Sequence, residues 1–233
     1  MFTAKFIKNI FLDKEGIKAI GRSGKLTRVF AQQGTLDGAC GIYSLMMMLI
    51  FHKKLDWEDL IDGKRAKNNK FVDRIQYEFL YDLSGICSGG YDFLEISDRA
   101  NQCFGGTMCE AYTTEPGTLN TISRCFLHEM IKFYLDNRRP VMLGYSKPSG
   151  PGHALVAIAY RREAKNRLRL FCLDPSHGVP FMHLWNTVID LDFFTSDDDD
   201  FTDTNYYAEK KIYVNSILII VDDILPPELD CPF

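Results

Sequence analysis

The residue best suited by type and position to act as a nucleophile is Cys40. It stands in the stretch Asp-Gly-Ala-Cys-Gly, directly before an apolar run that is rich in good helix formers. The first N–H groups of a helix are unpaired and the dipole is positive there, so a thiolate is favoured and the thiol pKa falls. Gly38 and Gly41 carry no side chain that would obstruct a substrate. Cys40 is therefore the strongest candidate among the seven cysteines.

A cysteine nucleophile also needs a general base and a group that orients that base. His153 begins the apolar run HALVAIAYRR, and Asp174 ends the run LRLFCLD just before Pro175. If the runs are adjacent antiparallel strands, the start of one lies beside the end of the next, and Asp174 reaches the His153 ring. Taken singly, each residue also fits a plain role as core cysteine, surface histidine or turn former. Their order, with each at the end of an element, favours chemistry.

The elements that must position these residues fall into two groups. Apolar spacing and glycine stops predict helices within 39–52, 56–63, 67–85, 91–106 and 118–139. Runs of Val, Ile, Leu and aromatic residues predict strands at 140–146, 153–162, 168–174 and 212–222. This order predicts an α+β fold: an N-terminal helical half with a buried central helix that carries the cysteine, then a mostly antiparallel sheet that carries the histidine and the aspartate.

Three finer features are also predicted. Asp37 is expected to cap the helix that begins at about Ala39. The helix within 118–139 is expected to be amphipathic, with Ile122, Phe126, Met130 and Phe133 on one face. The segment TSDDDDFTDTN, residues 195–205, is expected to be a solvated acidic loop because like charges repel one another.

Bulk properties exclude several classes of protein. A length of 233 residues favours one domain, 1–233. A net charge of -4 offers no basic surface, so no nucleic-acid partner is expected. The longest nearly uncharged run, 38–51, is shorter than the roughly 20 residues that span a bilayer, so no membrane span is predicted. Charges interrupt the first twenty residues, which predicts a cytoplasmic protein, or one delivered without a cleavable signal peptide.

The cysteines predict thiols and not a disulfide framework, because seven is an odd number and their spacing is irregular. Cys103 and Cys109 are close in sequence, but no histidine and no CxxC pair accompanies them, so no metal site is predicted.

Together these motifs resemble the papain-like cysteine peptidases. They are most similar to the branch of bacteriocin-processing (double-glycine leader) peptidases and their stand-alone relatives. The resemblance covers 32–54, with Gln, Asp-Gly-Ala-Cys-Gly and an apolar helix, and 139–176, with Arg-Pro-Val-Met-Leu, Gly-His-Ala-Leu-Val and Leu-Asp-Pro. Residues 55–137 and 177–233 match none of its motifs. The resemblance implies one papain-like domain over 1–233 with a helical insert at about 55–137.

Carried onto this sequence, the resemblance implies that Cys40 is the nucleophile, His153 the general base and acid, and Asp174 the group that orients the histidine. A glutamine before the cysteine would stabilise the oxyanion together with the cysteine's backbone N–H. The family's usual spacing is six residues, whereas Gln33 lies seven and Gln32 eight before the cysteine, and we prefer Gln33. The substrate implied is a protein or a peptide, with no metal or organic cofactor, and the oligomeric state is not predicted.

Two alternatives to a peptidase stay open. Papain-like bacterial effectors and toxins also deamidate glutamine side chains of partner proteins, and they are often compact domains with a private helical insert. The scaffold can also serve binding alone. The irregular glutamine spacing favours the binding module, and so does His177 in DPSHG, which offers an alternative ring. The presence of all three residue types in the required order favours an enzyme.

Overall fold

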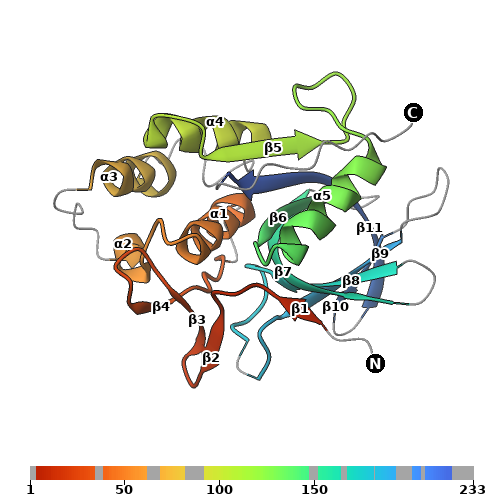
Figure 1. Cartoon of the computed structure of the whole chain (residues 1–233), viewed down its shortest axis with the longest axis horizontal. Coiled ribbons are helices and arrows are strands. Elements are labelled where there is room, and N and C mark those ends of the chain that lie inside the picture. The colour runs from red at the N-terminus through yellow and green to blue at the C-terminus, as the bar shows by residue number, and fades with distance from the viewer. Residues whose placement is uncertain are drawn as a thin grey trace.

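Most of the helices lie on one side of the molecule and most of the strands on the other, as Figure 1 shows. The computed structural model describes residues 4–34, 39–61, 69–81, 92–146, 152–163, 167–180, 182–192, 201–205 and 208–221. The predicted α+β class and the antiparallel sheet are confirmed.

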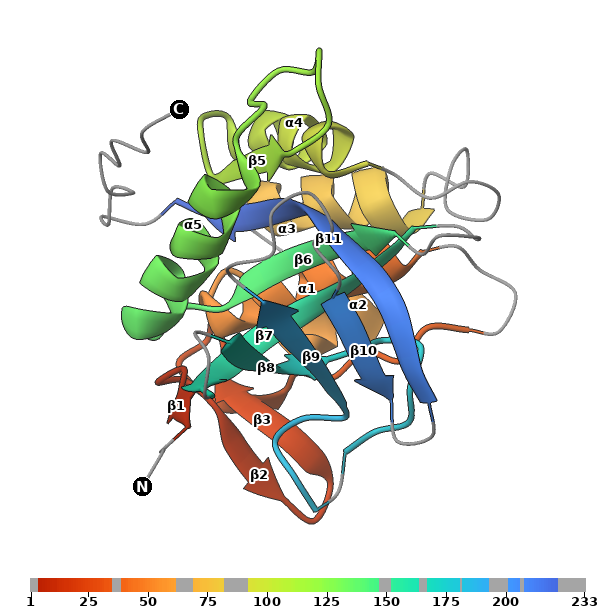
Figure 2. The same cartoon turned by 90° about the vertical axis from the view of Figure 1, so that its right-hand side faces the viewer.

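Six antiparallel strands form a closed barrel. They are β6 (Val141–Ser146), β7 (His153–Arg162), β8 (Arg167–Leu173), β9 (Thr187–Asp192), β10 (Phe201–Asn205) and β11 (Ala208–Ile220). Each strand pairs with its successor in the chain, and β11 pairs with β6 to close the ring. Figure 2 shows these strands in front of the helices that lie between residues 40 and 76, with the helix at 124–136 beside the barrel. Closure satisfies the backbone of the barrel without leaving a free edge along its length.

Five short strands lie outside this ring. β1 (Lys5–Phe6) pairs with β7, and β5 (Cys109–Thr113) pairs with β11. β2 (Phe11–Asp13), β3 (Gly16–Ile20) and β4 (Leu26–Arg28) form a separate antiparallel sheet. The predicted order of helices followed by strands is therefore wrong, because strands precede the first helix and one lies among the helices. These strands have two to five residues, too few for a periodic signal in the sequence.

All five predicted helical segments contain a helix. The helices are α1 (Cys40–Phe51), α2 (Trp57–Ile61), α3 (Lys70–Gln76), α4 (Phe93–Phe104) and α5 (Arg124–Asp136), and the π-helical turn η1 (Tyr77–Tyr81) continues α3. The side chains of Asn69, Asp92 and Ser123 accept N–H bonds at the starts of α3, α4 and α5. Such caps satisfy N–H groups that have no partner inside the helix.

Helix α1 lies in the core, between β3, α4 and the barrel strands β6 and β7. Every residue of α1 except Cys40 and Tyr43 is buried, which confirms the prediction of a buried helix. Burial of each large apolar side chain contributes about 1.5–3 kcal/mol, so the methionine-rich run fixes the helix firmly. Among the described residues, no helix is both long and apolar enough to cross a bilayer.

The predicted apolar face of α5 is confirmed only in part, because Met130 is buried whereas Ile122, Phe126 and Phe133 pack against the core without being fully buried. The residues that α5 buries are Leu127, His128, Met130, Ile131, Tyr134 and Leu135. Phe126 and Phe133 are only partly buried, and Ile122 precedes the helix. α5 packs against β6, β7 and β11, and this contact selects a face about one position further along than the predicted one.

The predicted acidic loop is also wrong in part, because Phe201–Asn205 forms β10. Asp and Asn are poor strand formers, but β10 is paired on both sides, with β9 and with β11. Residues 195–200 of that segment lie outside the described residues.

We predict that Asn9 joins the small sheet to the end of α1. Its Nδ2 donates to the carbonyls of Ile20 at 2.8 Å and Phe51 at 3.0 Å, and its Oδ1 accepts from the Ile20 N–H at 2.8 Å. Asn9→Ala leaves these part-buried groups unpaired, and we expect the free energy of unfolding in urea to fall by about 1–3 kcal/mol. Asn9→Asp keeps the acceptor but sets a carboxylate against two carbonyl oxygens, so the free energy of unfolding should fall by at least as much.

The matched control for this prediction is Lys8→Ala, at an exposed neighbouring position, which should change stability by less than about 0.5 kcal/mol. Equal unfolding midpoints for wild type and Asn9→Ala would contradict the role of Asn9.

Candidate functional site

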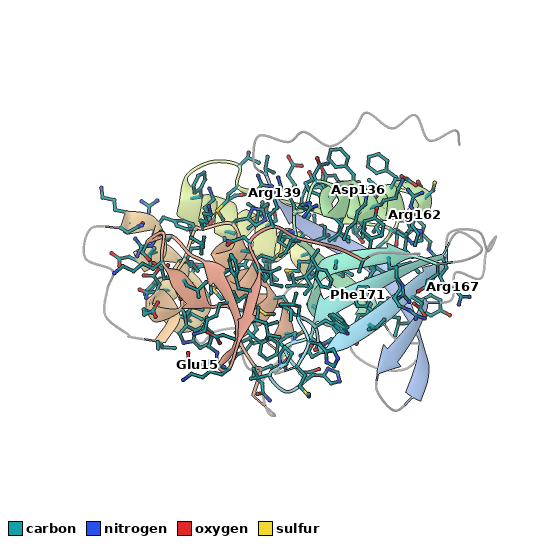
Figure 3. All side chains as sticks on the ribbon, turned by 60° about the horizontal axis from the view of Figure 1, so that its bottom comes forward. Glu15, Asp136, Arg139, Arg162, Arg167 and Phe171 are labelled. Atoms are coloured by element: carbon teal, nitrogen blue, oxygen red, sulfur yellow. The ribbon has the colours of Figure 1, made fainter. Side chains whose placement is uncertain are left out.

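The course of β7 and β8 places His153 and Asp174 at one end of the barrel. β7 runs from His153 to Arg162, and β8 returns from Arg167 to Leu173. Figure 3 shows Arg162 and Arg167 on the side of the barrel away from α1 to α3, with Phe171 closer to those helices. His153, which opens β7, and Asp174, which follows β8, therefore lie at the opposite, helical end.

The ring of His153 is bound to the carboxylate of Asp174, with 2.7 Å between Nε2 and Oδ1. Val156 of β7 is paired with Leu173 of β8, and continuing that register sets Asp174 opposite Leu155. His153 is then the diagonal neighbour of Asp174 on the same face, a separation that long side chains bridge. The predicted proximity of the two residues follows from this register.

Cys40 is the first residue of α1, and its sulfur meets the same histidine. The His153 ring and the backbone N–H groups of Gly41 and Ala154 lie close enough to the thiol to lower its pKa. Because Nε2 is bound to Asp174, Nδ1 is the ring nitrogen left for the sulfur. The N-cap residue Ala39 makes no side-chain cap, and the predicted cap Asp37 lies outside the described residues, as does Gly38.

The electrostatics favour a thiolate and an imidazolium. Burial raises the pKa of the Cys40 thiol, but the His153 hydrogen bond and charge and the two backbone N–H groups outweigh burial and lower it. Burial lowers the pKa of His153, but hydrogen bonds to Asp174 and Cys40 and their negative charges raise it to about 9. By contrast, burial raises the pKa of Cys103 to about 11 and that of Cys109 to about 12.

Asp174 is ionised although its side chain is only 1% exposed. Burial raises the pKa of this carboxyl group, but contacts with His153, His177 and Ser176 hold it well below its usual range. The N–H and Oγ of Ser176 lie 2.8 and 2.7 Å from Oδ1. Asn186 fixes the backbone here, accepting from the Asp174 N–H at 2.7 Å and donating to its carbonyl at 2.9 Å.

Two aromatic neighbours complete this cluster: Tyr145, which was missed from sequence, and His177, which was expected only as an alternative ring. Tyr145 lies opposite His153 in the β6–β7 pairing, and the two rings meet edge to face with centroids 5.5 Å apart. This buried ring limits the rotation of the histidine. Asp174 also contacts His177, with 2.9 Å between Oδ2 and Nδ1. The Asp-Pro-Ser-His sequence is a turn signal that points to this second contact.

The two glutamine candidates occupy different environments. The backbone N–H of Gln33 donates to the carbonyl of Pro175 at 2.8 Å, next to Asp174. The side chain of Gln33 is partly buried, with its Oε1 out of contact with solvent, whereas Gln32 is exposed. The backbone bond brings Gln33 to the turn that follows Asp174, and this placement favours Gln33 over Gln32.

Within the part of the chain that the structure describes, no group of three or more His, Cys, Asp or Glu side chains is arranged to hold a metal ion. The described side chains at this site bring together the Cys40 thiol, the His153 ring and the buried Asp174 carboxylate. Comparison with known proteins finds no protein-family model and no curated protein that matches the chain. The function of the site is inferred from its own geometry.

We predict the pH dependence of Cys40 alkylation from these shifts. A lowered thiol pKa keeps the thiolate as the pH falls below 9, the ordinary value, and His153 stays protonated until the pH rises through about 9. The alkylation rate should therefore be level over the range between the two pKa values. In His153→Ala, only burial and the backbone N–H groups still act on the pKa of the Cys40 thiol. The alkylation rate should therefore rise at a higher pH than in wild type.

The measurement is the rate of iodoacetamide modification at each pH, followed by peptide mapping. Exposed Cys125 is the reference thiol within the same molecule. At pH 6 we expect Cys40 to react at least about tenfold faster than Cys125 in wild type. Superimposable Cys40 profiles for wild type and His153→Ala would refute the pairing.

Proposed function

We propose that this protein is a cysteine-dependent amide hydrolase of the papain-like type that cleaves a peptide bond in a protein or peptide substrate. One observation carries the proposal: the Cys40 thiol, at the start of a helix, lies beside the His153 ring, which buried Asp174 holds through Nε2. These are the parts of a cysteine acyl-transfer site. The resemblance of the motifs to papain-like peptidases supports the choice of a peptide bond.

In the first step the Cys40 thiolate attacks the carbonyl carbon of the substrate amide. An S–C bond forms and the carbonyl oxygen becomes an oxyanion. As the oxyanion collapses, the C–N bond breaks and the His153 imidazolium gives its proton to the leaving amine. A thioester and a neutral imidazole remain.

In the second step water hydrolyses the thioester. Neutral His153 takes a proton from water, and the hydroxide attacks the thioester carbonyl. The S–C bond breaks and a carboxylic acid is released. The Cys40 thiolate and protonated His153, which keeps the proton taken from water, are thereby restored. Asp174 keeps the ring in one orientation throughout, since its carboxylate remains on Nε2.

The oxyanion requires hydrogen-bond donors that are in place before reaction. The backbone N–H of Cys40 belongs to the first turn of α1, where N–H groups have no partner inside the helix. The side chain of Gln33 is the second donor in this proposal, and its backbone bond to Pro175 supports the assignment.

Deamidation of a partner's glutamine remains the enzymatic alternative, because the same thioester chemistry acts on a side-chain amide. A thiol nucleophile stays reduced in a reducing compartment. We therefore propose that the protein acts in the cytoplasm, or in a compartment that it reaches without a cleavable signal peptide. The substrate surface is not assigned.

The experiment compares wild type with Cys40→Ala on proteins of a cell extract. New protein termini, identified by mass spectrometry, should appear with wild type, and the rate should drop by at least about a thousandfold in the variant. Cys125→Ala is the matched control because it removes an exposed thiol far along the chain from the site, and it should retain full activity.

Three other outcomes count against a peptidase. Conversion of glutamine to glutamate without chain cleavage would establish the deamidase instead. An unchanged extract, with Cys40 nevertheless reactive, would favour a binding module. Equal cleavage by wild type and Cys40→Ala would remove Cys40 from the mechanism.

A further inference from the structure

The two oxygens of the Asp174 carboxylate serve different histidines. Oδ1 accepts from His153 Nε2 at 2.7 Å and from both donors of Ser176. Oδ2 lies 2.9 Å from Nδ1 of His177, an ion-pair contact that is not aligned as a hydrogen bond in this structure. The carboxylate thus lies between two imidazole rings, and the mechanism proposed above uses only one of them.

A tight turn directs His177 back to the aspartate. The His177 N–H donates to the Asp174 carbonyl at 3.1 Å, and Pro175 fixes the first corner of the turn. Thr187 Oγ1 and Ser176 Oγ each lie 3.4 Å from His177 Nδ1. The His177 side chain remains 34% exposed, so packing alone does not account for its position.

A carboxylate bound at one oxygen is still free to rotate about its terminal torsion, because that torsion has a broad energy minimum. A donor on the second oxygen removes this freedom. It also lowers the cost of keeping the charge at a site that is 1% exposed. Loss of that donor would let Oδ1 leave His153, and Cys40 would then lose part of its thiolate.

We propose that His177 is a positioning residue, whose Nδ1–H holds the Asp174 carboxylate in the orientation that binds His153. The inference rests on the proposed function, because it gives His177 a part in activating Cys40. It requires only a proton on Nδ1, which one neutral tautomer and the charged ring both carry.

Two substitutions separate hydrogen bonding from packing. His177→Asn keeps an N–H donor close to the place of Nδ1 and loses the ring, while His177→Phe keeps the ring and loses the donor. The readouts are the Cys40 alkylation rate at pH 6 and the NMR titration of the His153 ring. Thermal melting confirms that each variant is folded, and His177→Ala provides a smaller side chain without a donor.

We expect His177→Phe and His177→Ala to slow Cys40 alkylation by about 10- to 100-fold, the usual effect of removing a group that orients a functional histidine. The His153 titration should move to lower pH in both. His177→Asn should stay within about threefold of wild type, because the donor is retained.

If His177 serves packing alone, the Cys40 alkylation rate of His177→Phe should be close to that of wild type, and the rate of His177→Asn should be reduced. That result would overturn the inference. An unshifted His153 titration in His177→Phe and His177→Ala would also overturn the inference. If Cys40 of wild type reacts no faster than Cys125, the proposed function fails. The His153 titration then still decides the role of His177, since it reports the bond to Asp174 without any reaction.

Discussion

Strand β7 is the element on which the two sides of the molecule converge. It pairs with β6 and β8 inside the barrel and with β1 beyond the end of β6, and helices α1 and α5 pack against it. All its residues from Ala154 to Tyr160 are buried. A register slip of one residue would turn these side chains to the wrong faces, so the strand has one stable position. The positions of His153 and its neighbours follow from that constraint.

The residues of the candidate site were accessible from sequence because each stands at the boundary of an element with a strong local signal. β7 begins at His153 as predicted, since an unbroken apolar run follows it. β8 ends before Asp174 because Pro175 cannot continue a paired strand. α1 begins at Cys40, where the helix-forming run starts. Such local signals can be recognised in the sequence without knowing which segments pack against each element.

The rest depends on contacts between distant segments. β10 forms from poor strand residues because β9 and β11 flank it, and α5 buries the face that the barrel selects. The bond from Gln33 to Pro175 joins positions far apart in the chain, and no pattern within either segment announces it. His177 is an intermediate case. Its turn sequence could be recognised, but its contact with the second oxygen of Asp174 is known only from the three-dimensional structure.

The closed barrel has a consequence for the order of events during synthesis. Cys40 leaves the ribosome early, whereas His153 and Asp174 come much later, and the strand that closes the ring, β11, ends at Ile220. Until β11 pairs with β6, the elements that hold the histidine against the sulfur are incomplete. Until then Cys40 lacks the neighbouring groups that lower its pKa, and its thiol is an ordinary one. Under the proposed function, the topology therefore delays the activation of Cys40 until the ring of strands is closed.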